Sequence, residues 1–140
     1  MNYSLYLFDG KGREITNPTQ SEIGLELDAL KPITPTKGAV SDFIILSRER
    51  PVKNGCQFVQ TLLKRDGSFL IEARFEYGAK EFEQYQRFTK DINEVKENFR
   101  MFALGVSPNI TRWTDITKNI LASNVKQRRN QHGKLNRVSW

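Results

Sequence analysis

The fold is decided by residues 56–88, which read CQFVQTLL (56–63), KRDG (64–67), SFLIEARFEYGAK (68–80) and EFEQYQRF (81–88). From Phe69 to Glu76, apolar residues alternate with mostly polar ones, the period-two pattern of a strand with one apolar face. The Asp66-Gly67 pair is a strong hairpin signal, because Gly readily adopts the positive φ of tight turns. These runs predict three consecutive strands joined by short turns, which is an antiparallel meander.

Two further strands are expected before the meander. Residues 3–8 form a short β-rich run, followed by a loop that begins at the glycine-rich stretch 9–12. Residues 42–47 form a nearly continuous apolar run, as expected of a strand that is buried on both faces.

Two helices are predicted from capping residues and from the spacing of apolar positions. Thr19 and Glu22 form a capping-box pattern before the amphipathic stretch 20–30. Asp91 is placed to cap the stretch 91–104, and Gly105 follows it as a candidate left-handed C-terminal residue.

The sequence therefore predicts an α+β fold, with a mainly antiparallel sheet of about five strands in the order β-α-β-β-β-β-α and two helices on one face. Apolar residues from Trp113 to Leu121 recur at helix-like spacing and are expected to form a short amphipathic turn or helix on the sheet. We expect a single domain over residues 1–121 and a basic, flexible C-terminal tail over residues 122–140.

The positive charge is concentrated at one end of the chain. The net charge is +6, from 22 Lys and Arg against 16 Asp and Glu. All the acidic residues precede residue 118, whereas six basic residues follow residue 117, so 22 − 6 = 16 basic residues balance the 16 acids before it. Basic segments bind nucleic acid by neutralising phosphates. The candidate nucleic-acid contacts in the tail are Lys126, Arg128, Arg129, Lys134 and Arg137.

Residues that could carry catalysis are few and poorly placed. His132, the only histidine, lies in the polar tail, where we expect an ordinary solvated side chain. Cys56, the only cysteine, is expected to be a buried structural thiol. The sequence contains no glycine-rich phosphate loop and no His/Cys/Asp cluster with the spacing of metal ligands. We therefore expect no enzymatic activity and no cofactor.

The polar residues of the meander have two interpretations. Glu72, Glu76, Glu81 and Glu83 alternate with Arg74 and Arg87, which favours cross-strand charge pairs on a solvated face. The mixture of aromatic, amide and charged side chains also suits protein recognition. The candidate partner-binding residues are Glu72, Arg74, Gln84, Tyr85, Gln86, Arg87 and Trp113.

The location of the protein is predicted from what the sequence lacks. Residues 1–9 have no basic segment followed by a long apolar run, as a signal peptide would. No stretch approaches the roughly 18 apolar residues that a membrane span needs. With a single cysteine, a reducing cytoplasmic location away from the membrane is the default expectation.

About half of the chain resembles a recurring pattern in small bacterial proteins. The resemblance is carried by Phe43 to Leu46, Phe58-Val59-Gln60-Thr61, Phe69-Leu70-Ile71-Glu72, Tyr85-Gln86, the helix that ends before Gly105, and Trp113. This pattern resembles that of immunity-type proteins found beside bacterial toxins, and of related families. The resemblance implies a protein without enzymatic activity that binds another protein, as an immunity or adaptor protein does. Nucleic-acid binding through the basic tail is the alternative.

Overall fold

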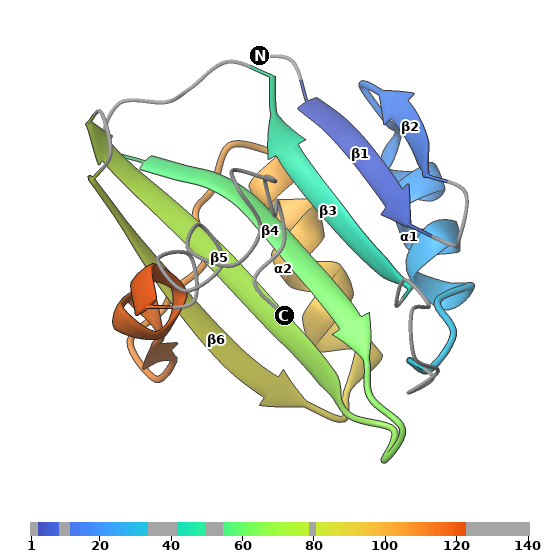
Figure 1. Ribbon diagram of the computed structural model, residues 1–140. Helices are drawn as coiled ribbons and strands as arrows, with labels where there is room; N and C mark the ends of the chain where they lie inside the picture. The colour runs from blue at the N-terminus through green and yellow to red at the C-terminus, as the bar shows by residue number, and fades with distance from the viewer. Residues whose placement is uncertain (1–2, 9–11, 34–41, 50–54, 79–80, 123–140) are drawn as a thin grey trace.

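The computed structural model describes residues 3–8, 12–33, 42–49, 55–78 and 81–122. In this part of the chain, seven antiparallel strands form one sheet in the order β2-β1-β3-β4-β5-β6-β7 (Figure 1). The strands are β1 (Tyr3–Phe8), β2 (Arg13–Thr16), β3 (Phe43–Arg48), β4 (Gly55–Leu63), β5 (Phe69–Gly78), β6 (Glu81–Thr89) and β7 (Thr114–Asp115). No helix in the described ranges is both long and apolar enough to cross a membrane.

Strands β4, β5 and β6 form the predicted meander. Leu63 pairs with Phe69 around the first turn, and Gly67 adopts a φ of 87° there. Residues 70–76 of β5 pair with β4 on one side and with β6 on the other, so β5 lies in the middle of the meander. Its side chains consequently contact neighbours on two strands.

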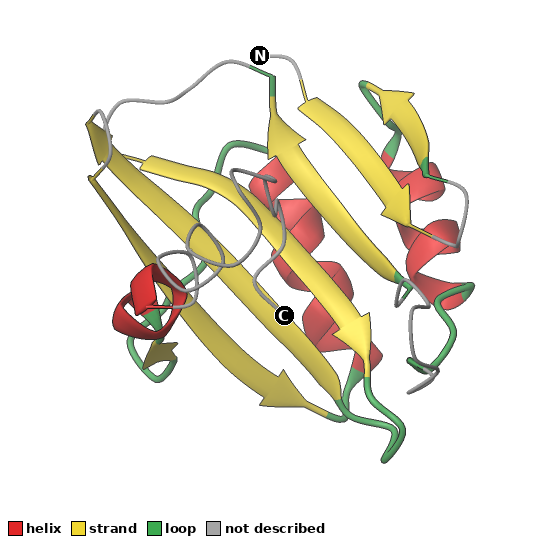
Figure 2. Cartoon of the chain, viewed as in Figure 1, coloured by secondary structure: helices red, strands yellow, loops and turns green. Residues whose placement is uncertain are grey.

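The two named helices, α1 (Gln20–Asp28) and α2 (Ile92–Ala103), pack on one face of the sheet (Figure 2). Thr19 and Glu22 form the expected capping box at the start of α1. Asp91 caps α2 by accepting a hydrogen bond from the backbone N–H of Asn93 at 2.9 Å. These bonds satisfy N–H groups that have no partner within a helix, which explains why both helices begin where the sequence predicts.

Helix α2 ends in a Schellman motif. Gly105, with a φ of 88°, donates its N–H to the carbonyl of Phe102, and Val106 donates to that of Met101. The chain then crosses to the far edge of the sheet, where Ile116 donates its N–H to the carbonyl of Gln84. A short helical segment over residues 117–122 follows β7, beside β6 (Figure 1).

The sheet has a helix-covered face and a second face. On the helix-covered face, Val95, Phe99 and Phe102 of α2 are fully buried against a core that includes Val59 and Ile71. On the second face, a smaller cluster of Phe43, Ile45 and Leu62 is buried. Strand β3 contributes to both clusters, which confirms the prediction that its apolar run is buried on both sides.

The α+β class and the mainly antiparallel sheet are confirmed, whereas the counts of about five strands and two helices are too low, since the described residues form seven strands and, with the segment 117–122, three helices. The sequence predicted a loop at the position of strand β2. The strand was missed because its four residues, REIT, are too few to show a periodic pattern. Strand β7 has only two residues, within the stretch expected to be helical. Residue 122, predicted to begin the tail, ends the helical segment 117–122, and the rest of the predicted tail, with its five candidate nucleic-acid contacts and His132, lies outside the described residues.

Candidate functional site

The predicted partner-binding residues lie on both faces of the sheet. Glu72, Arg74, Gln84 and Gln86 lie on the second face, because Glu72 is opposite Gln86 and Arg74 is opposite Gln84. Tyr85 lies on the helix-covered face, where its ring packs edge-on against Phe75 at 6.0 Å. Arg87 lies on that face too, since it pairs with Glu94 of α2. The candidate partner-binding residues of β5 and β6 are therefore divided between the two faces of the sheet.

Gln60, Glu72 and Gln84 form a buried polar row across strands β4, β5 and β6, which we call the Glu72 cluster. All three side chains are fully buried. Gln84 Nε2 donates to Glu72 Oε1 at 2.7 Å, and Gln60 Nε2 donates to Glu72 Oε2 at 3.3 Å. The interpretation of this region as a solvated face is consequently wrong for Glu72 and Gln84.

Arg74 completes the row at its β6 end. Its Nε donates to Gln84 Oε1 at 2.7 Å, and its guanidinium lies over the rings of Phe82 and Phe58, with its central carbon 4.1 and 5.3 Å from their centroids. Such stacking holds a guanidinium in place through cation–π attraction. Arg74 therefore bonds to an amide, and not to an acid across the strands as the sequence suggested.

Burial raises the pKa of the Glu72 carboxyl to about 7, and the hydrogen bonds from Gln84 and Gln60 offset only part of this effect. Gln60 Oε1 is buried and has no hydrogen-bond partner among the residues that the structure describes. The Glu72 cluster is thus a polar network that is incompletely satisfied, which costs stability.

A pocket of about 400 Å³ lies between β6, α2 and the loop that leads to β7. We call it the Trp113 pocket. Its lining residues are Arg87, Glu94, Asn98, Asn109, Thr111, Arg112 and Trp113. Two of the predicted partner-binding residues, Arg87 and Trp113, are brought together here.

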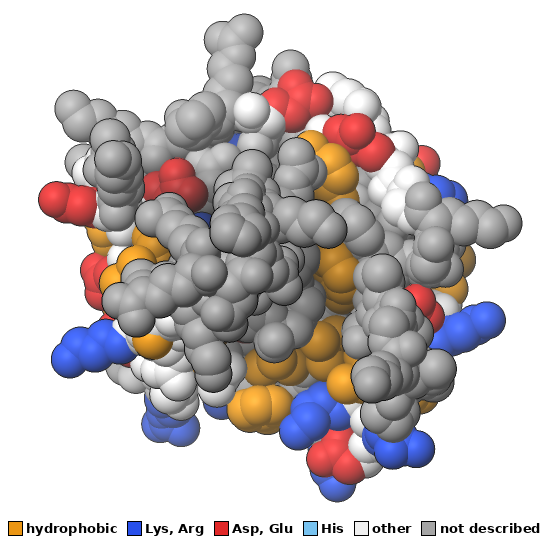
Figure 3. Space-filling view, viewed as in Figure 1, with side chains coloured by type: hydrophobic (Ala, Val, Ile, Leu, Met, Phe, Trp, Pro, Cys, Tyr) orange, Lys and Arg blue, Asp and Glu red, His pale blue; other side chains and the backbone are white. Residues whose placement is uncertain are grey.

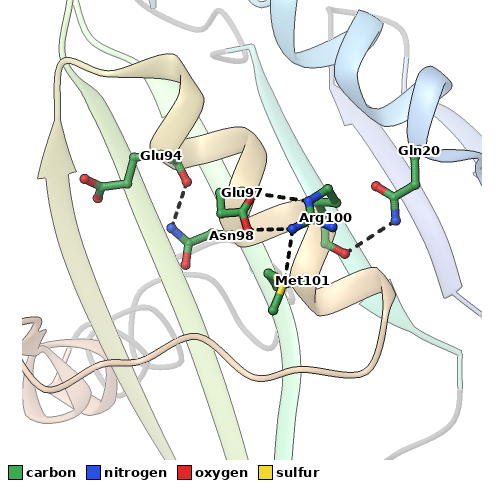
Figure 4. A network of polar contacts seen from close by, with 6 residues as sticks. All are labelled: Gln20, Glu94, Glu97, Asn98, Arg100 and Met101. Carbon is green, nitrogen blue, oxygen red and sulfur yellow. Dashed lines mark hydrogen bonds and ion pairs between the residues drawn. The ribbon is translucent and has the colours of Figure 1, made fainter.

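The wall of the pocket formed by β6 and α2 is held by bonds within the protein. Arg87 donates to Glu94 through both Nε and Nη2, and these bonds raise the pKa of Arg87. Asn98 Nδ2 donates to the main-chain carbonyl of Glu94 at 2.9 Å, so the Asn98 amide is turned back along the helix (Figure 4). Arg87 and Glu94 are partly exposed, which leaves this ion pair accessible to a ligand.

The wall of the pocket formed by the loop is shaped by an Asx turn at Asn109. Asn109 Oδ1 accepts hydrogen bonds from Thr111 N at 3.2 Å and from Thr111 Oγ1 at 2.6 Å. Trp113 donates its backbone N–H to the carbonyl of Ile110, and its partly buried side chain packs against the main core. The Trp113 ring is therefore fixed at the pocket, whereas the neighbouring Arg112 is exposed.

Sequence reasoning missed Glu94, Asn98, Asn109, Thr111 and Arg112 as lining residues. Glu94 and Asn98 fall within the predicted helix 91–104, and the loop residues have no periodic pattern. The available signal was the polar stretch around Trp113, with Asn109 and Thr111 spaced as in an Asn turn.

Cys56 is the remaining candidate nucleophile. Its side chain is fully buried, as expected of a structural thiol, and burial raises its pKa to about 12. Within the described ranges, no group of three or more His, Cys, Asp and Glu side chains is arranged to hold a metal ion.

No protein-family model and no curated protein matches this sequence. Among solved structures, the chain is similar to a crystal structure of a hypothetical protein from Neisseria gonorrhoeae. The TM-score is 0.48 and the sequence identity 11%, and the match covers 77% of this chain and 89% of that chain.

Proposed function

We propose that this chain is a protein-binding module without enzymatic activity, of immunity or adaptor type, and that the Trp113 pocket is part of its binding surface. The observation that supports the proposal is the position of Trp113 and Arg112 side by side at the rim of a concave site. Trp and Arg are enriched among the residues that contribute most to protein–protein affinity.

The composition of the pocket favours a protein partner over a small molecule. Pockets for small ligands are lined mostly by apolar and aromatic side chains. Here six of the seven lining residues are polar or charged, and Trp113 is the one apolar member. Protein interfaces combine a few aromatic and Arg anchors with a polar rim, which matches this lining better.

The chain near the pocket adds apolar surface. Leu104 and Val106 are 60% and 46% exposed, in the stretch that joins α2 to the pocket loop. Exposed side chains of this size give a partner apolar area to bury beside the polar pocket. We propose that residues 104–113 form the contact segment.

Affinity capture from the source cell with the full chain as bait tests the proposal. The wild-type chain is compared with Arg112→Glu and with a matched charge reversal, Arg65→Glu, in the exposed hairpin turn between β4 and β5. We expect a protein that the wild type and Arg65→Glu retain and that Arg112→Glu loses. With the purified partner, Arg112→Glu should weaken the affinity by about 30-fold, the effect of losing a hot-spot contact of about 2 kcal/mol. Capture of no protein, or equal retention by all three chains, would contradict the proposal.

A further inference from the structure

We infer that the Trp113 pocket binds a carboxylate group of the partner protein. This inference rests on the proposed function and names the chemistry of the contact. It depends on which polar groups of the pocket are already occupied and which are available.

The acceptor groups of the pocket are mostly occupied. Both oxygens of the Glu94 carboxylate accept hydrogen bonds from Arg87, and the main-chain carbonyl of Glu94 accepts one from Asn98. Asn109 Oδ1 accepts two from Thr111. A ligand that mainly donates hydrogen bonds, such as an ammonium group, would share the Glu94 oxygens with the donors already bound to them.

The donor groups of the pocket are available. In the described part of the chain, Arg112 has no ion-pair partner, and neither the Asn109 side-chain amide nitrogen nor the Trp113 indole N–H donates a hydrogen bond. These three residues belong to one short loop. Their donors are open to solvent, and a ligand with two oxygens on one carbon can replace water at more than one of them.

The charge of the lining selects a negative acceptor. The lining contains two guanidinium groups, those of Arg87 and Arg112, and one carboxylate, that of Glu94, which leaves one excess positive charge. A guanidinium binds a carboxylate through two parallel hydrogen bonds, which are stronger than bonds to a neutral carbonyl. The ring of Trp113 offers apolar surface for the methylene groups of an Asp or Glu side chain.

The carboxylate can come from an acidic side chain or from the C-terminus of the partner. A titration of the full chain, followed by nuclear magnetic resonance, distinguishes these sources. The probes are N-acetylglutamate amide for the side chain, N-acetylalanine for the terminal group, and N-acetylglutamine amide as the neutral control. We expect the carboxylate probes to shift the side-chain signals of Arg112 and Trp113, while the neutral probe leaves them unchanged. The stronger of the two carboxylate probes identifies the source.

Two variants complete the test. Arg112→Gln should lose the shift of the Trp113 indole signal, whereas the matched Arg65→Gln should retain it. Equal shifts with the neutral probe, or shifts that persist in Arg112→Gln, would overturn the inference. The proposed function and this inference can fail separately. If Arg112→Glu loses the partner in the capture experiment but neither carboxylate probe produces a response, the protein-binding proposal stands. Only the recognition of a carboxylate is then contradicted.

Discussion

Glu72 lies in the middle of the sheet between two amides, and its protonation state affects the stability of the fold. Its pKa is raised to about 7 from an ordinary value of 4.5. Between these values the folded chain keeps the proton that the unfolded chain has lost. The free energy of unfolding therefore contains a contribution from Glu72 that is fully present below pH 4.5 and is lost as the pH rises through about 7.

Substituting Glu72→Gln should remove the cost of burying a charged carboxylate and so stabilise the protein at pH 8, where Glu72 is ionised in both the folded and the unfolded chain. An amide at position 72 can accept from Gln84 and, once the Gln60 amide turns over, donate to the oxygen of Gln60, so that Arg74, Gln84 and residue 72 donate in one direction along the row. We expect Glu72→Gln to raise the free energy of unfolding at pH 8 by about 1–3 kcal/mol, and to change it less at pH 5. Urea unfolding at both pH values measures the difference.

The matched control is Glu76→Gln, on the same face of β5 but partly exposed, for which no gain in stability at pH 8 is expected. A Glu72→Gln variant that is less stable than the wild type at pH 8 would show that the carboxylate form is the one the fold accommodates.

At the scale of single elements, two glycines are predicted to respond in opposite directions to the same change. Gly105 ends α2 with a φ of 88°, where a β-carbon is strained by about 1–2 kcal/mol. Gly24 lies within α1, and a β-carbon there would meet no atom within 4 Å. Thermal or urea unfolding should show that Gly105→Ala destabilises the protein by that amount, while Gly24→Ala stabilises it by about 0.5–1 kcal/mol. The same sign for both substitutions would contradict the backbone geometry described for them.

The elements that the sequence predicted are those with a long periodic pattern or a capping signal. The meander has both alternation and an Asp-Gly turn, and α2 has a cap, an apolar stripe and a terminal glycine. Strands β2 and β7 have neither a long periodic pattern nor a capping or turn signal. They are held by pairing with β1 and β6 at the two edges of the sheet. Short edge strands of this kind depend on contacts between distant residues, which period counting does not capture.

At the scale of the whole molecule, the two named helices lie on one face of the sheet, and the Glu72 cluster lies on the other. Both named helices lie behind the sheet in the view of Figure 1, and the view of Figure 3 looks at the opposite, second face, where hydrophobic and charged side chains lie together. The pairing register between β5 and β6 decides which residues of the two strands share a face. It places Tyr85 and Arg87 on the opposite face from Glu72 and Arg74.

The Trp113 pocket could be predicted only in part for a related reason. Arg87 and Trp113 were singled out by residue type, but Glu94, Asn98 and Arg112 join them through the packing of α2 and its following loop beside β6. Likewise, the burial of the Glu72 cluster could not be predicted, because the alternation of acidic and basic residues in this region is also typical of a solvated face. In both cases residue type indicated importance, and tertiary structure decided which residues act together.

The central claim is that residues 104–113 contact a partner protein, and amide hydrogen exchange of the full chain tests it most directly. Exchange is compared for the chain alone and with the protein retained in the capture experiment. We expect the largest gain in protection in residues 104–113, with little change in α1 or in the turn around Gly67. Protection that appears in α1 or on the second face while residues 104–113 exchange unchanged would contradict the account.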